Sequence, residues 1–263
     1  MRSKQLQLDR YDTDKIINRY MEEYDQVLEP WVQKEIRLLE LGINKGGSLL
    51  LWRDYFQKAT IVGIDLKLPK DFTPGERLYL FQGSQTDSLF LSDVAKKTAL
   101  DGFDIIIDDA SHIGEFTKRS FWHLFDNHLK PGGLYAIEDW GAGYLDDFPD
   151  GKSIDIDRVF RSKFRTRLLT RFSFIMNKYY AKLKEYPQKI QNILLIPFNF
   201  LLKVPYRTHS YGIVGFVKQL IDEQGASNVT KARLTGKPVR QSKFADMLIT
   251  QNIVFIRKAT NQP

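Results

Sequence analysis

Short hydrophobic runs alternate with longer stretches of helical periodicity along the first half of the chain. The runs cover residues 36–41, 59–64, 78–81, 103–107 and 134–139 and are rich in Leu, Ile and Val, as is typical of strands buried on both faces of a parallel sheet. Amphipathic segments at 12–28, 48–56 and 115–127 predict helices, the first with Thr13 as its N-cap. Strands joined by helix-length connections imply a doubly wound α/β core with right-handed crossovers.

A second block of regular pattern closes the chain. Residues 211–224 place Ile, Val, Phe and Leu on one helical face, and Gly225 ends this helix. Two further runs, at 228–234 and 251–257, predict the last strands as an antiparallel pair at the edge of the sheet. The expected fold is therefore α/β and Rossmann-like, with a doubly wound seven-stranded sheet that is mostly parallel and has an antiparallel C-terminal strand.

Between these blocks the pattern changes, and the change divides the chain into four predicted parts. They are an N-terminal helical segment at 1–30, a core at 31–150, an insertion at 151–207 and the completion of the core at 208–263. Between residues 152 and 207, Lys and Arg outnumber Asp and Glu by thirteen to three, so the net charge of +7 originates there. This basic and aromatic composition suits a lid over an acceptor or, through residues 158–205, a peripheral contact with a membrane.

The amino-acid composition limits the kinds of site and the cellular location that we expect. The chain has no cysteine, which excludes disulfides, thiolate metal ligands and a cysteine nucleophile. Its N-terminus lacks the hydrophobic core of a signal peptide, and no hydrophobic run approaches the ~20 residues of a membrane span. We therefore expect a cytoplasmic protein in which any metal is held by oxygen or imidazole ligands.

Polar side chains follow two of the predicted strands. Asp108, Asp109 and His112 come directly after one run, and Glu138 and Asp139 end the next. In an open α/β sheet, ligands bind outside the carboxyl ends of the strands, so these side chains lie where chemistry is expected. A simpler alternative is that Asp108 or Asp109 caps the helix that follows.

A glycine-containing turn at 42–48 follows the first strand and opens a helix. Glycines at such a junction let backbone approach a ligand, although their spacing departs from the dinucleotide pattern GxGxxG, which disfavours an oxidoreductase. About twenty residues later a hydrophobic run ends in Asp65, where a carboxylate can accept hydrogen bonds from the ribose hydroxyls of an adenosine cofactor. NAD, FAD and S-adenosylmethionine all satisfy this pattern, and Ser84 and Gln85 could contact an adenine.

Together these segments resemble class I S-adenosylmethionine-dependent methyltransferases, and within them the metal-dependent sugar O-methyltransferases of macrolide biosynthesis, of the mycinamicin and macrocin type. The segments that carry the resemblance are Thr13-Asp14-Lys15, Leu39-Glu40-Leu41-Gly42, Gly46-Gly47-Ser48-Leu49, Trp52-Arg53-Asp54-Tyr55-Phe56, Gly63-Ile64-Asp65, Asp104-Ile105-Ile106-Ile107-Asp108-Asp109-Ala110-Ser111-His112, Leu129-Lys130-Pro131-Gly132-Gly133 and Ile137-Glu138-Asp139. The similarity covers residues 12–140 and resumes at 208–258. The chain has Ala110 where the family usually has glycine.

The resemblance implies a role for each site residue. The cofactor S-adenosylmethionine would be held by Glu40, Gly42, Ser48, Asp65 and Gln85, with Asp108 near its methionine portion. A divalent cation would be bound by Asp109, Glu138 and Asp139, and His112 would be the general base beside Asp109. Three carboxylates suit a hard cation such as Mg²⁺, which would lower the pKa of an acceptor hydroxyl so that a neutral histidine can take its proton.

The expected function is methyl transfer to a hydroxyl of a sugar or glycosylated natural product, with a small glycosidic acceptor and a homo-oligomeric enzyme. Two alternatives remain open. The same metal chemistry serves a catechol or another vicinal diol, and the basic insertion suits an RNA-binding protein that keeps a methyltransferase fold. Carboxylates at the strand ends would repel a nucleic-acid backbone, which disfavours the second alternative.

Overall fold

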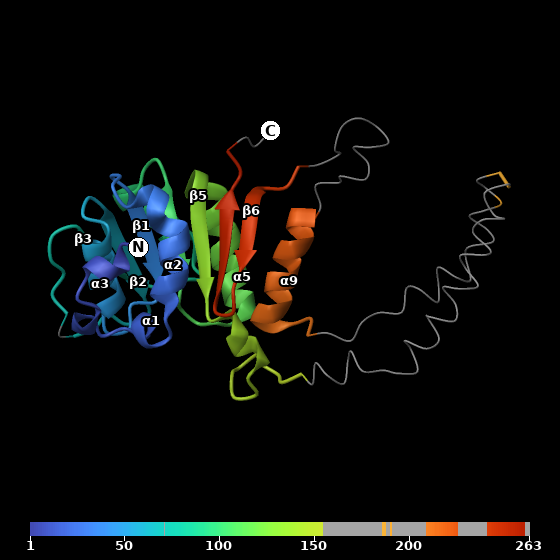
Figure 1. Cartoon of the computed structure of the whole chain (residues 1–263), viewed down its shortest axis with the longest axis horizontal. Coiled ribbons are helices and arrows are strands. Elements are labelled where there is room, and N and C mark those ends of the chain that lie inside the picture. Colours follow the sequence, from blue (N-terminus) through green and yellow to red (C-terminus); the bar gives the residue numbers. More distant parts are fainter. Residues whose placement is uncertain (71, 155–185, 188–189, 191–208, 226–240, 261–263) are drawn as a thin grey trace. The chain divides into compact units, whose positions relative to one another are not determined.

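The computed structural model describes residues 1–70, 72–154, 186–187, 190, 209–225 and 241–260 (Figure 1). The chain divides into two compact units, Met1–Lys152 together with Ser210–Pro263, and Ser153–His209. The predicted basic insertion at 151–207 lies almost entirely outside the described residues, and the predicted strand at 228–234 lies wholly outside them. The first unit contains the sheet and every predicted site residue.

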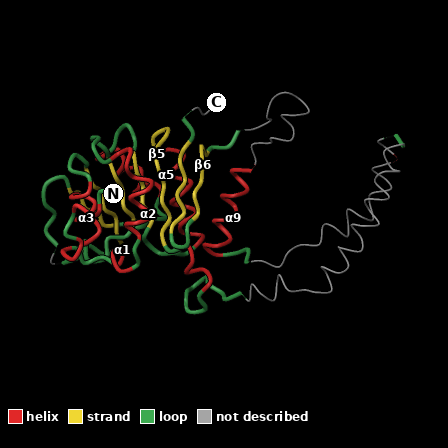
Figure 2. The backbone as a smooth tube through the Cα atoms, viewed as in Figure 1, coloured by secondary structure: helices red, strands yellow, loops and turns green. Residues whose placement is uncertain are grey.

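A seven-stranded sheet forms the centre of this unit, in the order β3-β2-β1-β4-β5-β7-β6 (Figures 1 and 2). Its strands are β1 (Arg37–Leu41), β2 (Thr60–Asp65), β3 (Leu78–Gln82), β4 (Phe103–Asp108), β5 (Leu129–Glu138), β6 (Phe244–Ile249) and β7 (Ile253–Lys258). Strands β1 to β5 pair in parallel, whereas β7 runs antiparallel to both β5 and β6. The predicted fold, a mostly parallel Rossmann-like sheet with an antiparallel C-terminal strand, is confirmed.

The order of the strands reverses between β1 and β4. From β1 the chain proceeds outward through β2 to β3 and then returns to place β4 on the other side of β1. At such a reversal the two connecting loops leave in opposite directions, so a crevice opens at the carboxyl ends of the strands.

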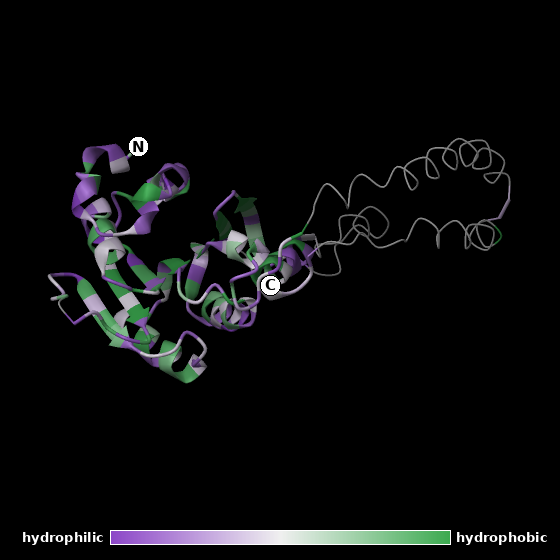
Figure 3. Cartoon of the chain, turned by 90° about the horizontal axis from the view of Figure 1, so that it is seen from below, coloured by the Kyte–Doolittle hydropathy of each residue, from purple (hydrophilic) through white to green (hydrophobic). Residues whose placement is uncertain are grey.

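Helices cover both faces of the sheet. The helices of the first face are α2 (Tyr20–Leu28) and α3 (Gly47–Tyr55), and those of the second face are α4 (Ser88–Thr98), α5 (Gly114–Asn127) and α9 (Gly212–Gly225). Successive strand residues point to opposite faces, so Leu38 packs with the first set of helices and Leu39 with the second. In Figure 3 the helices carry both hydrophobic and hydrophilic residues, as elements with one buried face do.

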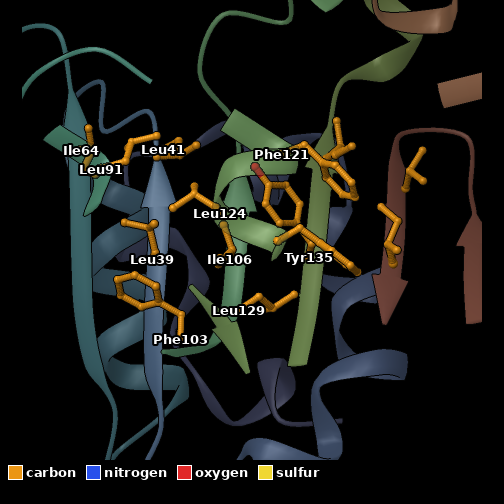
Figure 4. Packing of buried hydrophobic residues seen from close by; sticks show 14 of the residues in the cluster. Leu39, Leu41, Ile64, Leu91, Phe103, Ile106, Phe121, Leu124, Leu129 and Tyr135 are labelled. Carbon is orange, nitrogen blue, oxygen red and sulfur yellow. The ribbon is translucent and has the colours of Figure 1, made fainter. Parts of the chain in front are cut away.

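The core of the second face is built around aromatic and branched side chains. Ile106 and Tyr135 of the sheet lie beside Phe121 and Leu124 of α5 in this cluster (Figure 4). The run Ile105-Ile106-Ile107 is completely buried, with Ile106 facing this cluster and the other two facing the opposite one. The prediction of a strand buried on both faces is therefore confirmed.

Three elements differ from the sequence prediction. The predicted helix at 12–28 is two helices, α1 (Asp14–Ile17) and α2, because Arg19 between them has a left-handed backbone with φ of 61°. The turn predicted at 129–133 is the beginning of β5, whose pairing with β4 is irregular there. The sequence does not predict β6, because four of its six residues are exposed. In the described part of the chain, every helix is too short or too polar to span a membrane.

Candidate active site

A pocket of ≈ 590 Å³ lies at the carboxyl ends of β1 to β4. Residues of the N-terminal segment 12–17 form one wall, and loops that follow the four strands form the others. The predicted site residues that line it are Gly42, Ser48, Asp65, Gln85, Asp109 and His112. The pocket is thus at the reversal between β1 and β4, where α/β proteins bind their ligands.

Gly42 joins two walls of the pocket. Its φ is 94°, in the left-handed region that favours glycine, and its amide donates to the carbonyl oxygen of Ile64 at 2.8 Å. A Cβ at this position would lie 2.0 Å from the carbonyl oxygen of Asp109. Glycine is therefore required here because the backbone after β4 packs directly against the turn after β1.

Asp65 organises the same turn. Its Oδ2 accepts hydrogen bonds from the amides of Ile43 (2.7 Å) and Asn44 (3.1 Å), and its Oδ1 accepts one from the amide of Lys67 (3.0 Å). A carboxylate has about four acceptor directions, so three are used within the protein. One acceptor direction of Asp65 therefore remains for a ligand.

Glu40 points away from the pocket. It is completely buried and accepts hydrogen bonds from Ser48 Oγ (2.8 Å) and Trp52 Nε1 (3.1 Å), while the ammonium of Lys15 lies 3.4 Å away. Burial raises the pKa of Glu40, and Lys15 and the two hydrogen bonds oppose that rise. The structure thus places Ser48 at the wall of the pocket and Glu40 behind it, where it supports that wall.

Asp108 also lies behind the pocket. Its carboxylate accepts hydrogen bonds from Ser120 Oγ (2.7 Å), Gln85 Nε2 (3.2 Å) and the Tyr135 hydroxyl (3.2 Å). Burial raises the pKa of Asp108 to about 6, against the lowering effect of the Ser120 and Tyr135 hydrogen bonds. Gln85 lines the pocket, and its Oε1 accepts from the Ser111 amide at 3.2 Å. The structure therefore connects Asp108 to the pocket through Gln85.

Neither aspartate caps the helix that follows. The N-cap residue of α5 is Ile113, and the first helical amide, that of Gly114, donates to Asp150 Oδ2 at 2.7 Å. The simpler explanation of Asp108 and Asp109 as capping residues is therefore excluded. Their placement at the end of β4 needs another cause.

Asp109, His112 and Asp139 come together at the edge of the pocket. One possible ligand atom from each residue lies within 4.8 Å of the other two. His112 Nε2 is 3.8 Å from Asp109 Oδ1 and 3.8 Å from Asp139 Oδ2. His112 and Asp139 both have left-handed backbones, with φ of 52° and 53°, a strained conformation that concentrates at functional sites. Burial raises the pKa of Asp139.

The N-terminal segment contributes a cation to this group. Lys15 is completely buried, and its ammonium lies 2.5 Å from Asp109 Oδ2, 2.8 Å from Glu138 Oε2 and 3.4 Å from Glu40 Oε1. Burial lowers the pKa of Lys15, but the three carboxylates outweigh this effect and hold the pKa well above its usual value. These carboxylates therefore favour the charged form of Lys15.

Glu138 faces the protein interior. Its Oε2 is bound by Lys15, and its Oε1 accepts a hydrogen bond from the Tyr24 hydroxyl at 2.5 Å. Burial raises the pKa of Glu138 despite these partners. The neighbouring Asp139 accepts a hydrogen bond from the Tyr20 hydroxyl. The predicted carboxylates are thus close together, but Glu138 is engaged by Lys15 and Tyr24, whereas His112 faces the two aspartates.

We call Glu40, Asp109, Glu138 and Asp139, together with Lys15 and His112, the acidic cluster. Its carboxylates carry four negative charges when ionised, against the one positive charge of Lys15. Carboxylate and imidazole ligands without sulfur suit Mg²⁺ or Mn²⁺. Both the charge and the donor set of the cluster therefore fit a divalent cation.

Lys15, Tyr20 and Tyr24 have contacts in the site that no sequence motif predicts. The two tyrosines are four residues apart, a spacing that predicts only a packing face of a helix. In the structure their rings are buried and their hydroxyls reach the carboxylates of Asp139 and Glu138. The one available signal is Lys15 itself, a charged residue within a segment that carries the family resemblance.

No protein-family model matches the chain. Curated relatives do match about half of it. Mycinamicin VI 2''-O-methyltransferase of Micromonospora griseorubida is 35% identical over 148 residues, which cover 53% of this chain and 36% of that enzyme. Demethylmacrocin O-methyltransferase of Streptomyces fradiae is 38% identical over 141 residues, which cover 49% of this chain and 35% of that enzyme. The match therefore spans little more than a third of either relative.

Solved structures match over a longer stretch. The MycE methyltransferase from the mycinamycin biosynthetic pathway, in complex with Mg, SAH and mycinamycin VI, gives a TM-score of 0.61 at 24% identity and covers 95% of this chain and 53% of that one. Another crystal form of MycE with Mg and SAH gives 0.57 at 25% identity and covers 90% and 48%. The comparisons confirm the methyltransferase fold and the resemblance to sugar O-methyltransferases of macrolide biosynthesis.

Proposed function

We propose that the chain is an S-adenosylmethionine-dependent O-methyltransferase that acts, with a divalent cation, on a hydroxyl of a sugar or glycosylated natural product. The observation that carries the proposal is that one pocket holds both required parts, the glycine turn with Asp65 and the loop from Asp109 to His112. Support comes from relatives described as O-methyltransferases of mycinamicin VI and demethylmacrocin, and from MycE in complex with Mg and SAH, the demethylated form of the cofactor.

The cofactor side of the pocket is the turn after β1 with its neighbours. We assign Gly42, Ser48, Asp65 and Gln85 to S-adenosylmethionine because all four line the pocket. Glu40 and Asp108, which the sequence also assigns to the cofactor, would act one layer behind, through Ser48 and Gln85.

The acidic side of the pocket would bind the metal and move the proton. When bound, a divalent cation would lower the pKa of the acceptor hydroxyl and so make it a better nucleophile. We assign Asp109 and Asp139 as ligands and His112 as the base that takes the hydroxyl proton. Glu138, the third ligand expected from the sequence, already binds Lys15 and Tyr24, and these two partners would compete with the cation for its carboxylate.

Calorimetric titration of SAH into the full chain, with and without Mg²⁺, tests the proposal. We expect binding by the wild-type protein and about tenfold weaker binding by Asp65→Asn, since the amide keeps only part of the acceptor capacity. Asp93→Asn is the matched control, because Asp93 is an exposed carboxylate on α4. A wild-type chain that does not bind SAH would refute the proposed function.

A titration with Mn²⁺ distinguishes the two possible roles of His112. An imidazole nitrogen that coordinates a cation cannot also accept the proton of the acceptor. If His112→Ala abolishes methyl transfer but keeps Mn²⁺ affinity, His112 is the base. If the same variant loses tenfold or more in Mn²⁺ affinity while Glu138→Gln does not, His112 is the third ligand in place of Glu138.

The class of acceptor needs its own experiment, because the same cluster would serve any two adjacent oxygens. Glycosylated macrolides and simple catechols are assayed side by side, and we expect methylation of the glycosides. Transfer to catechols alone would favour the vicinal-diol alternative. A homo-oligomer, a membrane contact through residues 158–205 and a cytoplasmic location remain predictions from the sequence.

A further inference from the structure

The N-terminal wall of the pocket has almost no hydrophobic anchor. Asp12, Thr13, Asp14 and Ile17 line the pocket, yet α1 has only four residues, and isolated helices shorter than ~12 residues are marginal in water. Ile17 is 85% exposed, and the only buried side chain of α1 is that of Lys15. The residues on either side are anchored, since Tyr11 packs against the core and donates to Asp54 and Tyr20 is buried. Within residues 12–17 only Lys15 is buried, so this stretch needs contacts of its own with the core.

Three sets of contacts could hold residues 12–17 against the core. Lys15 reaches carboxylates at the ends of β1, β4 and β5. The backbone of Asp12 packs on Gly47, where a Cβ would lie 2.1 Å from the Asp12 carbonyl oxygen. Lys45 also pairs with Asp12 at 2.9 Å, but these side chains are 67% and 72% exposed, so solvent screens the pair. Among these contacts, only those of Lys15 involve a completely buried charged side chain.

We propose that Lys15 is a positioning residue that anchors residues 12–17 as a wall of the pocket by binding carboxylates of the acidic cluster. Its ammonium is bound by Asp109 and Glu138, which lie 94 and 123 residues further along the chain. The carboxylate of Asp109 therefore has two tasks, to hold the wall through Oδ2 and to face His112 through Oδ1. This inference rests on the proposed function only in treating the pocket as the cofactor site.

The next helix provides an internal reference. α2 buries Tyr20, Met21, Tyr24 and Leu28 in the core and so has hydrophobic anchors of its own. Loss of Lys15 should therefore loosen residues 12–19 and leave α2 in place. A purely structural role of Lys15 in the stability of the whole fold would not produce this local difference.

Hydrogen–deuterium exchange on the full chain measures the difference. The informative amides are those of Asn18 and Arg19, which donate to the carbonyl oxygens of Asp14 and Ile16. In Lys15→Met we expect these amides to exchange at least tenfold faster, with no change in α2, and the dissociation constant of SAH to rise at least tenfold.

Lys258→Met is the matched control. Lys258 is also a buried lysine, but its ammonium donates to the carbonyl oxygens of Phe125 and Asp126 near the end of α5 and of Leu129 at the start of β5. We expect this variant to keep wild-type exchange at Asn18 and Arg19 and wild-type affinity for SAH. Equal acceleration in both lysine variants would overturn the proposal.

A double variant keeps the test decisive if Lys15→Met alone does not fold. Lys15→Met leaves the buried carboxylate of Glu138 without its cation, so the double variant with Glu138→Gln is measured in parallel. Wild-type exchange at Asn18 and Arg19, in either Lys15→Met or the double variant, would overturn the proposal. If the wild-type chain fails to bind SAH, the proposed function fails, while the exchange rates still decide whether Lys15 anchors the wall.

Discussion

The titration of Asp108 provides a quantitative test of the electrostatics behind the pocket. Its carboxyl group is only 2% exposed, and burial raises its pKa from 3.8 to about 6. We predict that Asp108→Asn changes how the stability of the protein depends on pH over this interval. The effect follows from a difference in proton binding between the folded and unfolded chains.

The sign of the effect can be worked out directly. Between pH 3.8 and about 6 the folded protein keeps the Asp108 proton, while the unfolded chain has released it. The free energy of unfolding therefore falls by ~1.4 kcal/mol for each pH unit, or ~3 kcal/mol over the whole interval. The loss is absent in stronger acid, where both states are protonated, and complete above about pH 6. An asparagine does not titrate, so the variant lacks this contribution.

Urea unfolding of the wild-type protein and Asp108→Asn between pH 4 and pH 7 provides the measurement. The wild-type value minus the variant value should fall by ~3 kcal/mol across this range. Changed hydrogen bonds to Ser120 and Tyr135 add only a constant offset, and the other carboxyl groups titrate in both proteins. Parallel curves would mean that Asp108 is already ionised in the folded protein at pH 4, which would refute the burial argument.

Three further substitutions test single contacts. Gly42→Ala should lower the free energy of unfolding by at least ~2 kcal/mol in urea and weaken Mn²⁺ binding in a titration, because its Cβ would lie 2.0 Å from the Asp109 carbonyl oxygen. Tyr24→Phe removes the 2.5 Å hydrogen bond to the buried Glu138 and should cost ~1–3 kcal/mol by the same unfolding measurement. Asp87→Ala removes the N-cap of α4 and should cost ~1 kcal/mol, with no change in SAH affinity by calorimetry. Unchanged stability in any of them would contradict the contact concerned.

The central parallel strands could be predicted because they are buried on both faces. Ile105, Ile106 and Ile107 are completely buried, and such a run leaves a clear signal in the sequence. β6 leaves no such signal, since most of its side chains are exposed and, among the described strands, it pairs with β7 alone. The break at Arg19 was equally invisible, because a left-handed residue in a helical pattern depends on tertiary contacts.

At the candidate site, the sequence indicated strand ends that meet at or beside the pocket, but not the direction of each side chain. Asp108 is the last residue of β4 and Asp109 the next, and successive side chains of a strand point to opposite faces. Asp108 accordingly turns toward Ser120 of α5, and Asp109 toward Lys15. The partners lie up to 94 residues away, so no local pattern could reveal which aspartate would face the pocket.

The strand order places the pocket, and Gly42 sets how closely its two sides approach each other. The reversal of strand order leaves the ends of β1 and β4 open side by side, and Gly42 lets the two following loops touch. The turn assigned to the methyl donor therefore contacts, through Gly42, the backbone of Asp109, whose side chain is assigned to the cation. Methyl transfer depends strongly on holding donor and acceptor at close range and in line. Gly42→Ala should therefore lower kcat by a larger factor than it lowers the affinity for either SAH or Mn²⁺, whereas equal factors would mean that the contact serves binding alone.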